Sequence, residues 1–191
     1  MTTSPTMDKW LKTRCVGCGR CCTETIVPVT DSDVKRLMKH TGKKAQEIVR
    51  FFGTADVEWT DGDESWIHTT DGNRFLALIK AQNRCQFLDD DNRCTVYEAR
   101  PMTCRTFPLQ IILNEAETKI ENITLNRIVK KNYPRSDKPT KTKKLAFEQG
   151  LAEDTEDAKF RKKIKAWNTA KRKGGLNAFL NFVGLTKGKS K

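Results

Sequence analysis

The spacing of the cysteines constrains this chain more than any other feature. All seven lie between residues 15 and 104, as an early group (Cys15, Cys18, Cys21 and Cys22) and a late group (Cys85, Cys94 and Cys104). Four thiols within eight residues are an unusual way to fill an apolar core, and an odd total fits a closed set of disulfides poorly. In a reducing compartment, clustered thiols are more often metal ligands. We therefore expect a metal centre.

The early group has the spacing of a ligand loop. The pair Cys15-x2-Cys18 can turn two sulfurs toward one centre, and Gly17 and Gly19 suit such a turn because glycine tolerates positive φ. The run through Cys21 also matches the first three ligands of a bacterial ferredoxin pattern, although no x3-Cys-Pro follows. Adjacent side chains point different ways in most backbone conformations. We therefore do not expect Cys21 and Cys22 to bind the same metal ion, and we expect that one of them serves a second ion, bridges, or stays available for chemistry.

The late group lies among turn signals and arginines. The run Asp89 to Asn92 is rich in turn-forming residues and can fold Cys94 back toward Cys85. Pro101 suits the first turn of a short helix that would carry Cys104. A thiolate cluster is strongly negative, so nearby donors and cations stabilise it and tune its potential. Arg100 and Arg105, on either side of Cys104, are our candidates for this role.

The spacing of the cysteines does not identify the metal. Four thiolates suit either Zn²⁺ or an iron–sulfur cluster, and seven exceed what one tetrahedral ion needs. The surplus permits two centres, or one cluster with spare thiols. Ferredoxin-like spacing, neighbouring arginines and surplus thiols favour an iron–sulfur cluster, with zinc as the alternative. His40 and His68 are far in sequence from the thiols and are not expected to be ligands.

Four motifs together resemble a known family. They are Cys-x2-Cys-Gly-x-Cys-Cys at 15–22, Cys-x-Phe-Leu at 85–88, Cys-x-Val-Tyr at 94–97 and Arg-Pro-x2-Cys-Arg-x-Phe-Pro at 100–108. This combination is similar to the bacterial cysteine-cluster family of zinc- or iron-chelating domains, which includes YkgJ-like proteins and the flagellin lysine N-methylase. The resemblance implies a metal or iron–sulfur centre held by all seven cysteines. It names no reaction, and the sequence offers no His–carboxylate pair near the cysteines, so no catalytic residue is nominated.

The remaining patterns predict a small α+β domain with the cysteine loops gathered at one end. Asp61-Gly62 and Asp71-Gly72 are hairpin-turn signals between strand-like segments. Gly42 is a helix-stop signal, and Phe51 and Phe52 are expected in the core. The expected elements are helices over 31–42 and 43–52, strands over 57–60, 66–69 and 74–80, and a hairpin formed by 111–114 and 119–124.

Charge divides the chain into two parts. Residues 1–129 carry equal numbers of basic and acidic side chains, whereas the last 62 residues carry 18 basic and 6 acidic ones and hence the whole net charge of +12. We therefore predict a cysteine-cluster metal-binding domain over 1–132 and a basic linker and helical extension over 133–191. Within the extension we expect an unstructured linker over 136–144 and helices over 155–173 and 176–183.

The extension has two interpretations. Phe160, Ile164 and Trp167 form an apolar stripe that can dock on the cysteine domain. Alternatively, residues 136–191 bind an acidic partner, nucleic acid or an acidic protein, in which case Trp167 could stack on a base, although packing of its indole is favoured. Binding to a membrane surface is a weaker third option. If the division is correct, deletion of residues 136–191 should leave the metal in place.

Two function classes follow. In the first, the protein holds an iron–sulfur cluster or zinc and performs redox or transferase chemistry; in the second, zinc is structural and the basic tail is a binding module. No apolar run is long enough to span a membrane or to act as a leader, so we expect a cytoplasmic protein. Whether it is an enzyme stays open.

Overall fold

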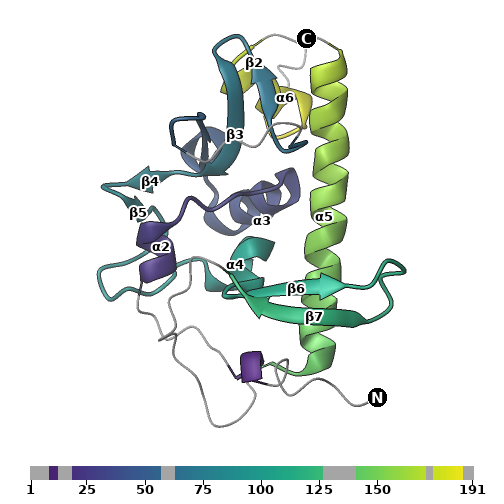
Figure 1. The fold of residues 1–191 in the computed structure, drawn as a ribbon. Helices are drawn as coiled ribbons and strands as arrows, with labels where there is room; N and C mark the ends of the chain where they lie inside the picture. The colour runs from purple at the N-terminus through teal and green to yellow at the C-terminus, as the bar shows by residue number, and fades with distance from the viewer. Residues whose placement is uncertain (1–8, 13–18, 57–62, 127–140, 171–173, 187–191) are drawn as a thin grey trace. The chain divides into compact units, whose positions relative to one another are not determined.

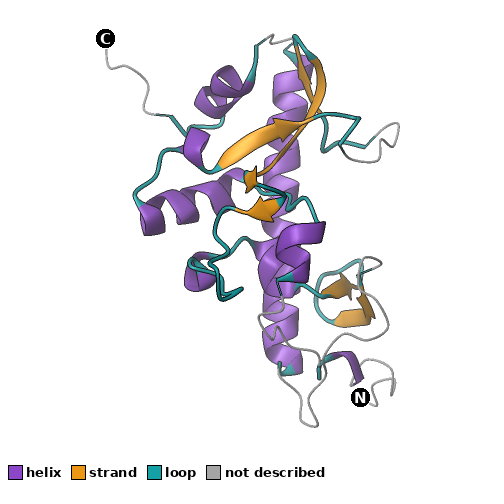
Figure 2. Ribbon diagram, turned by 90° about the vertical axis from the view of Figure 1, so that its left-hand side faces the viewer, coloured by secondary structure: helices purple, strands orange, loops and turns teal. Residues whose placement is uncertain are grey.

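The fold combines helices with small antiparallel sheets, as the sequence predicts (Figures 1 and 2). The computed structural model describes residues 9–12, 19–56, 63–126, 141–170 and 174–186. These residues form two compact units. The larger contains residues 19–101 and 156–191, and the smaller contains residues 1–18 and 102–155. In the described parts of the chain, no helix is long and apolar enough to cross a membrane.

A three-stranded antiparallel sheet is the centre of the larger unit. Its strand order is β1–β3–β2, with β1 at Val49–Phe52, β2 at Ile67–Thr69 and β3 at Gly72–Leu78. The β2–β3 turn contains the predicted Asp71-Gly72 signal, and Gly72 has a φ of +98°, which favours glycine. The predicted segment 57–60 and its turn at 61–62 lie outside the described residues.

Helix α3, Asp31–Thr41, follows the predicted signals closely. Thr30 and Asp33 form a reciprocal capping box, in which each side chain accepts a hydrogen bond from the other residue's backbone N–H. Gly42, with a φ of +70°, ends the helix. Val34 and Leu37 are fully buried, so the apolar face of α3 enters the core.

The helix predicted over Lys43–Phe52 is wrong. A short 3₁₀ turn, η1, covers Ala45–Glu47, and β1 begins at Val49. The β-branched residue Val49 pairs with Leu78 and Phe52 pairs with Phe75. A buried helical face and a buried strand would both explain why Ile48, Val49 and Phe52 are apolar. The segment is a strand because it pairs with β3.

Four further short elements carry or flank cysteines in the larger unit. They are α2 at Arg20–Glu24, β4 at Lys80–Ala81, β5 at Arg84–Cys85 and the 3₁₀ turn η2 at Tyr97–Ala99.

The C-terminal helices complete the core of the larger unit. Helix α5 runs over Lys143–Thr169, so it begins twelve residues before the predicted start, and α6 runs over Leu176–Phe182. The predicted stripe docks: Phe160, Ile164 and Trp167 are buried in one cluster with residues of α3 and the sheet. Trp167 is 2% exposed, and its indole N–H donates to the His68 carbonyl at 2.8 Å. Stacking of Trp167 on a nucleic-acid base is therefore incompatible with this structure.

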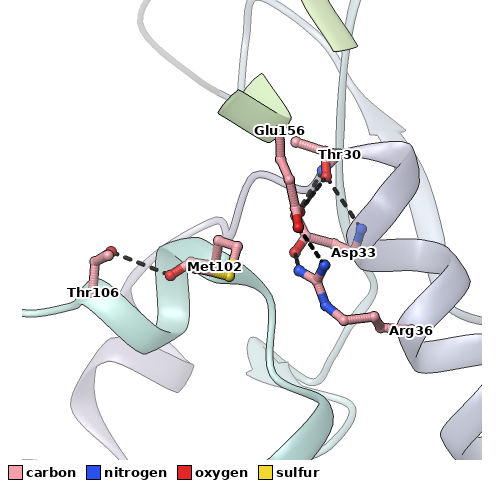
Figure 3. A network of polar contacts seen from close by, with 6 residues as sticks. All are labelled: Thr30, Asp33, Arg36, Met102, Thr106 and Glu156. Carbon is pink, nitrogen blue, oxygen red and sulfur yellow. Dashed lines mark hydrogen bonds and ion pairs between the residues drawn. The ribbon is translucent and has the colours of Figure 1, made fainter. Parts of the chain in front are cut away.

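A buried ionic network ties α3 to the C-terminal half of α5 (Figure 3). The Arg36 guanidinium bridges Asp33 and Glu156, with a distance of 2.6 Å from Nη1 to the Glu156 carboxylate. Lys163 similarly reaches Asp31 at 2.6 Å. Asp31 and Asp33 are 2% and 1% exposed, so their charges depend on these partners. Figure 3 also draws the hydrogen bond from Thr106 to the Met102 carbonyl, which lies inside the short helix α4, Met102–Thr106, of the smaller unit.

The smaller unit is built on the predicted hairpin. Strands β6, Leu109–Leu113, and β7, Ile120–Leu125, pair antiparallel after the short helix α4, Met102–Thr106. Leu109 and Ile123 share a small core with Leu11 and Ala146, the last from the first turns of α5. A Cβ on Gly150 would lie 2.7 Å from Ile111 Cγ2, so α5 approaches β6 closely at this glycine.

Removal of Arg36 tests the buried network. We expect Arg36→Ala to lower the free energy of unfolding by about 3 kcal/mol, because two buried or half-buried carboxylates lose their partner. Lys35→Ala is the control in the same helix: Lys35 is half-exposed and Asp31 retains Lys163, so the loss should be below ~1 kcal/mol. Urea denaturation of both variants measures this, and equal losses would contradict the role given to Arg36.

Deletion of the C-terminal helices tests the packing. Residues 127–140 lie outside the described residues, so the predicted boundary at 132–133 stays a prediction. Removal of residues 136–191, however, takes Phe160, Trp167 and Phe179 out of the core. We now expect this truncated chain to unfold and lose its metal, in contrast to our expectation from sequence. A chain ending at Thr186 is the control, and a folded, metal-loaded chain ending at residue 135 would refute this packing argument.

Candidate metal centre

Four of the seven cysteines lie in the described part of the larger unit. Cys21 and Cys22 are on α2, Cys85 is on β5, and Cys94 follows the next turn; all four are half-buried. Cys104 is on α4 in the smaller unit. Cys15 and Cys18 lie outside the described residues.

The sulfurs of Cys21 and Cys22 are in contact. Their Sγ atoms are 3.8 Å apart, so the expectation that the two side chains diverge is wrong. Two sulfurs on one tetrahedral Zn²⁺, each at about 2.3 Å from the metal, are also separated by about 3.8 Å. The pair therefore has a spacing that fits two ligands of one ion.

This contact changes the acidity of one thiol. The pKa of Cys21 is lowered to about 7, mainly by the hydrogen bond with the Cys22 thiol; burial opposes this shift, and the positive charge of Arg100 adds to it. A thiolate is the metal-binding form of cysteine. Cys21 is therefore partly in this metal-binding form near neutral pH.

Cys21 of the early group lies within electrostatic range of Cys85 of the late group. Burial is the main cause that raises the pKa of Cys85, and the neighbouring charges of Cys94 and Cys21 raise it further. Helix α2 packs against β5, which brings these residues together from positions more than 60 apart in sequence (Figure 1). A bound cation would relieve the repulsion among their thiolates.

A tight hairpin positions Cys85. The two turn residues Gln82 and Asn83 have φ angles of 50° and 62°, as in a type I′ turn, and the resulting register places Lys80 opposite Cys85. The Lys80 ammonium donates to the Thr23 carbonyl of α2, and its charge also acts on the Cys85 thiol. Lys80 was not among the residues predicted from the sequence. Had the two-residue turn at 82–83 been recognised from the sequence, its hairpin register would have placed Lys80 opposite Cys85.

The predicted turn at 89–92 is confirmed. Leu88 and Cys94 form an antiparallel bridge, and the Arg93 backbone N–H donates to the Asp89 carboxylate at 2.7 Å. This turn directs Cys94 back toward Cys85. It also reaches α2, because a Cβ placed on Gly19 would lie 2.9 Å from Asn92 Oδ1. Gly19 thus joins the early motif to the late loop.

The two predicted arginines lie in different units. Arg100 stacks on Tyr97, with the guanidinium 3.5 Å from the ring centroid, and its Nε donates to the Tyr97 carbonyl at 2.9 Å. This orientation is consistent with its effect on Cys21. Arg105 lies on α4 beside Cys104, and its carbonyl accepts a hydrogen bond from Lys141 at 2.5 Å.

No ready-made site is visible in the described ranges: no three His, Cys, Asp or Glu side chains there are grouped closely enough to hold a metal ion. His40, at the end of α3, and His68, on β2, belong to no such group. The described donors nevertheless fit a thiolate-bound metal, because Cys21 and Cys22 have the spacing of two shared ligands and Cys85 and Cys94 lie near them.

Gly19 tests the link between the two motifs. Gly19 and Gly42 both have a φ of +70°, so alanine at either position should cost roughly 1–2 kcal/mol of backbone strain. Only Gly19 is crowded, since nothing lies within 4 Å of a Cβ on Gly42. We expect Gly19→Ala to lower the metal content per chain and Gly42→Ala to retain it. Elemental analysis of the purified proteins measures this, and equal metal content in both would contradict the link.

Comparison with known proteins gives one match. Residues 14–126 match the family described as "CxxCxxCC: Putative zinc- or iron-chelating domain". No curated protein and no solved structure matches the chain. The match covers more than half of the 191 residues and includes all seven cysteines. The chain therefore belongs to the CxxCxxCC family of zinc- or iron-chelating domains.

Proposed function

We propose that this protein holds an iron–sulfur cluster through cysteines of both groups. In the larger unit the donors are Cys21, Cys22, Cys85 and Cys94, and we assign Cys15, Cys18 and Cys104 to the same or an adjacent centre. The observation that carries the proposal is the packing of α2, which bears Cys21 and Cys22, against β5, which bears Cys85. The charges of Cys94 and Cys21 both raise the pKa of Cys85, so ionising these thiols together is costly. A multivalent cationic centre is the natural partner of such a group.

Three features favour an iron–sulfur cluster over a single zinc ion. The ferredoxin-like spacing supplies several thiolates from one loop, the total of seven exceeds a tetrahedral set, and cations lie close to the sulfurs. Two contacting thiolates suit one iron of a [2Fe–2S] cluster, in which each iron takes two protein ligands. The same contact suits zinc, which is the alternative.

The protein's own groups stabilise the charge of the centre. Arg100, held by Tyr97, acts on Cys21, and Lys80 acts on Cys85 from the opposite strand of the hairpin. We assign Arg105 the same role beside Cys104. When bound, an iron–sulfur cluster supplies one-electron transfer, and cations near its sulfurs raise its reduction potential.

Redox or transferase chemistry is the activity we assign to the centre, without a catalytic residue. Iron–sulfur ligation requires reduced thiols, which supports a cytoplasmic location. The second candidate function is a structural zinc module whose basic C-terminal region binds an acidic partner. The exposed lysines of α5 support this second candidate, because they offer positive charge to an acidic partner.

Metal and sulfide analysis separates the two candidates. We expect protein purified without oxygen to be brown and to contain iron and acid-labile sulfide. We also expect the double variant Cys21→Ser/Cys85→Ser to lose most of both, because it removes one donor from each group. A colourless protein with stoichiometric zinc would contradict the iron–sulfur proposal and support the structural zinc module. Full metal content in the double variant would refute a centre shared by the two groups.

A further inference from the structure

The basic residues of α5 fall into two classes in the segment 156–169. Those beside the buried stripe are neutralised within the protein. Lys163 pairs with Asp31 at 2.6 Å, and Arg161 pairs with Asp157 at 2.6 Å and with Asp63 at 3.8 Å. The charges of Lys163 and Arg161 therefore form ion pairs within the protein.

The second class is a lysine face formed by Lys159, Lys162 and Lys165. All three are exposed, and none has an ion pair within the described residues. Spacings of three residues place them on one side of the helix, away from the buried stripe of Phe160, Ile164 and Trp167. The three positions span about 9 Å of helix axis.

The other exposed residues of the segment 156–169 are the small, uncharged Ala158, Ala166 and Thr169. Its two acidic side chains are each paired: Glu156 with Arg36, and the half-exposed Asp157 with Arg161. No large apolar residue is exposed in this segment. The surface therefore offers positive charge without hydrophobic anchors.

We propose that the lysine face of α5 binds the phosphodiester backbone of nucleic acid. This activity is separate from the metal centre and does not depend on the identity of the metal. Contacts from lysine ammonium groups to phosphates need neither base recognition nor apolar burial, and they bind many sequences alike.

The composition of the face disfavours the two other acidic partners. A helix that binds a membrane surface inserts Trp, Phe or Leu among the lipids, and none of these is exposed here. A stable protein interface usually has a desolvated centre with aromatic or aliphatic anchors, which this face also lacks. Of the three kinds of partner, only a phosphate backbone needs no more than the exposed lysines of this face.

The test compares two triple variants of the full chain. Lys159→Gln/Lys162→Gln/Lys165→Gln removes the lysine face, and Lys39→Gln/Lys43→Gln/Lys44→Gln removes the same charge from exposed lysines near the end of α3. Glutamine forms helices about as well as lysine, so both variants should fold. Metal content and circular dichroism, measured on the same samples, report the state of the metal centre and of the fold independently of binding.

The probe is a fluorescently labelled 20-nucleotide single-stranded RNA, titrated from 0.05 to 0.3 M salt, with duplex DNA of the same length as a second arm. Loss of three phosphate contacts should reduce the salt slope by about 2 and weaken binding about 100-fold at 0.1 M salt. The control triple should change affinity by less than about threefold. Equal losses in both triples, or no binding by the unmodified chain, would overturn the proposal. Tighter binding to polyglutamate or to phosphatidylserine vesicles than to either nucleic acid would overturn it in favour of that partner.

Discussion

The close grouping of partly buried thiols is the constraint on which the candidate metal centre depends. Cys21, Cys85 and Cys94 are half-buried, and burial together with the charges of Cys94 and Cys21 raises the pKa of Cys85, so ionising these thiols together is costly. The contact of Cys21 with Cys22 adds a fourth sulfur to this group. Lys80 and Arg100 offset part of the charge but are single cations among several sulfurs. A bound metal centre would offset the remaining cost, and its binding energy would then contribute to folding.

The scaffold around the sulfurs is small and depends on close contacts. Helix α2 has five residues, and β4 and β5 have two residues each. Such short elements are marginal alone. They are held by the Lys80 contact to Thr23, the approach of Asn92 to Gly19, and the packing of Cys85 and Cys94 against the main core. That core includes Phe160, Trp167 and Phe179 from the C-terminal helices, so those helices support the cysteine loops indirectly.

Local signals predicted several elements of the fold correctly because their physical causes are local. Thr30, Asp33 and Gly42 define α3 by capping, and Asp71-Gly72 defines a turn through its backbone freedom. The failure at 43–52 has a different origin, since β1 exists through pairing with β3, which no local pattern encodes. At the candidate site, the spacing identified the cysteines and the 89–92 turn. The contact of Cys21 with Cys22 and the role of Lys80 depend on backbone geometry and strand register, which composition does not reveal.

Net charge alone was a poor guide to the basic C-terminal region, and the structure shows why. The net charge of +12 counts every lysine and arginine, whether or not its charge is paired within the protein. In α5, however, burial of the stripe draws Lys163 toward Asp31 and leaves Arg161 between two acidic groups, so these cations stabilise the fold. Lys159, Lys162 and Lys165 face the other way and keep their charge for solvent or a partner. The same helix thus has one face that completes the core supporting the cysteine loops and one that is available for binding. If the proposed binding of nucleic acid holds, a metal-chelating domain and a phosphate-binding surface share this one helix.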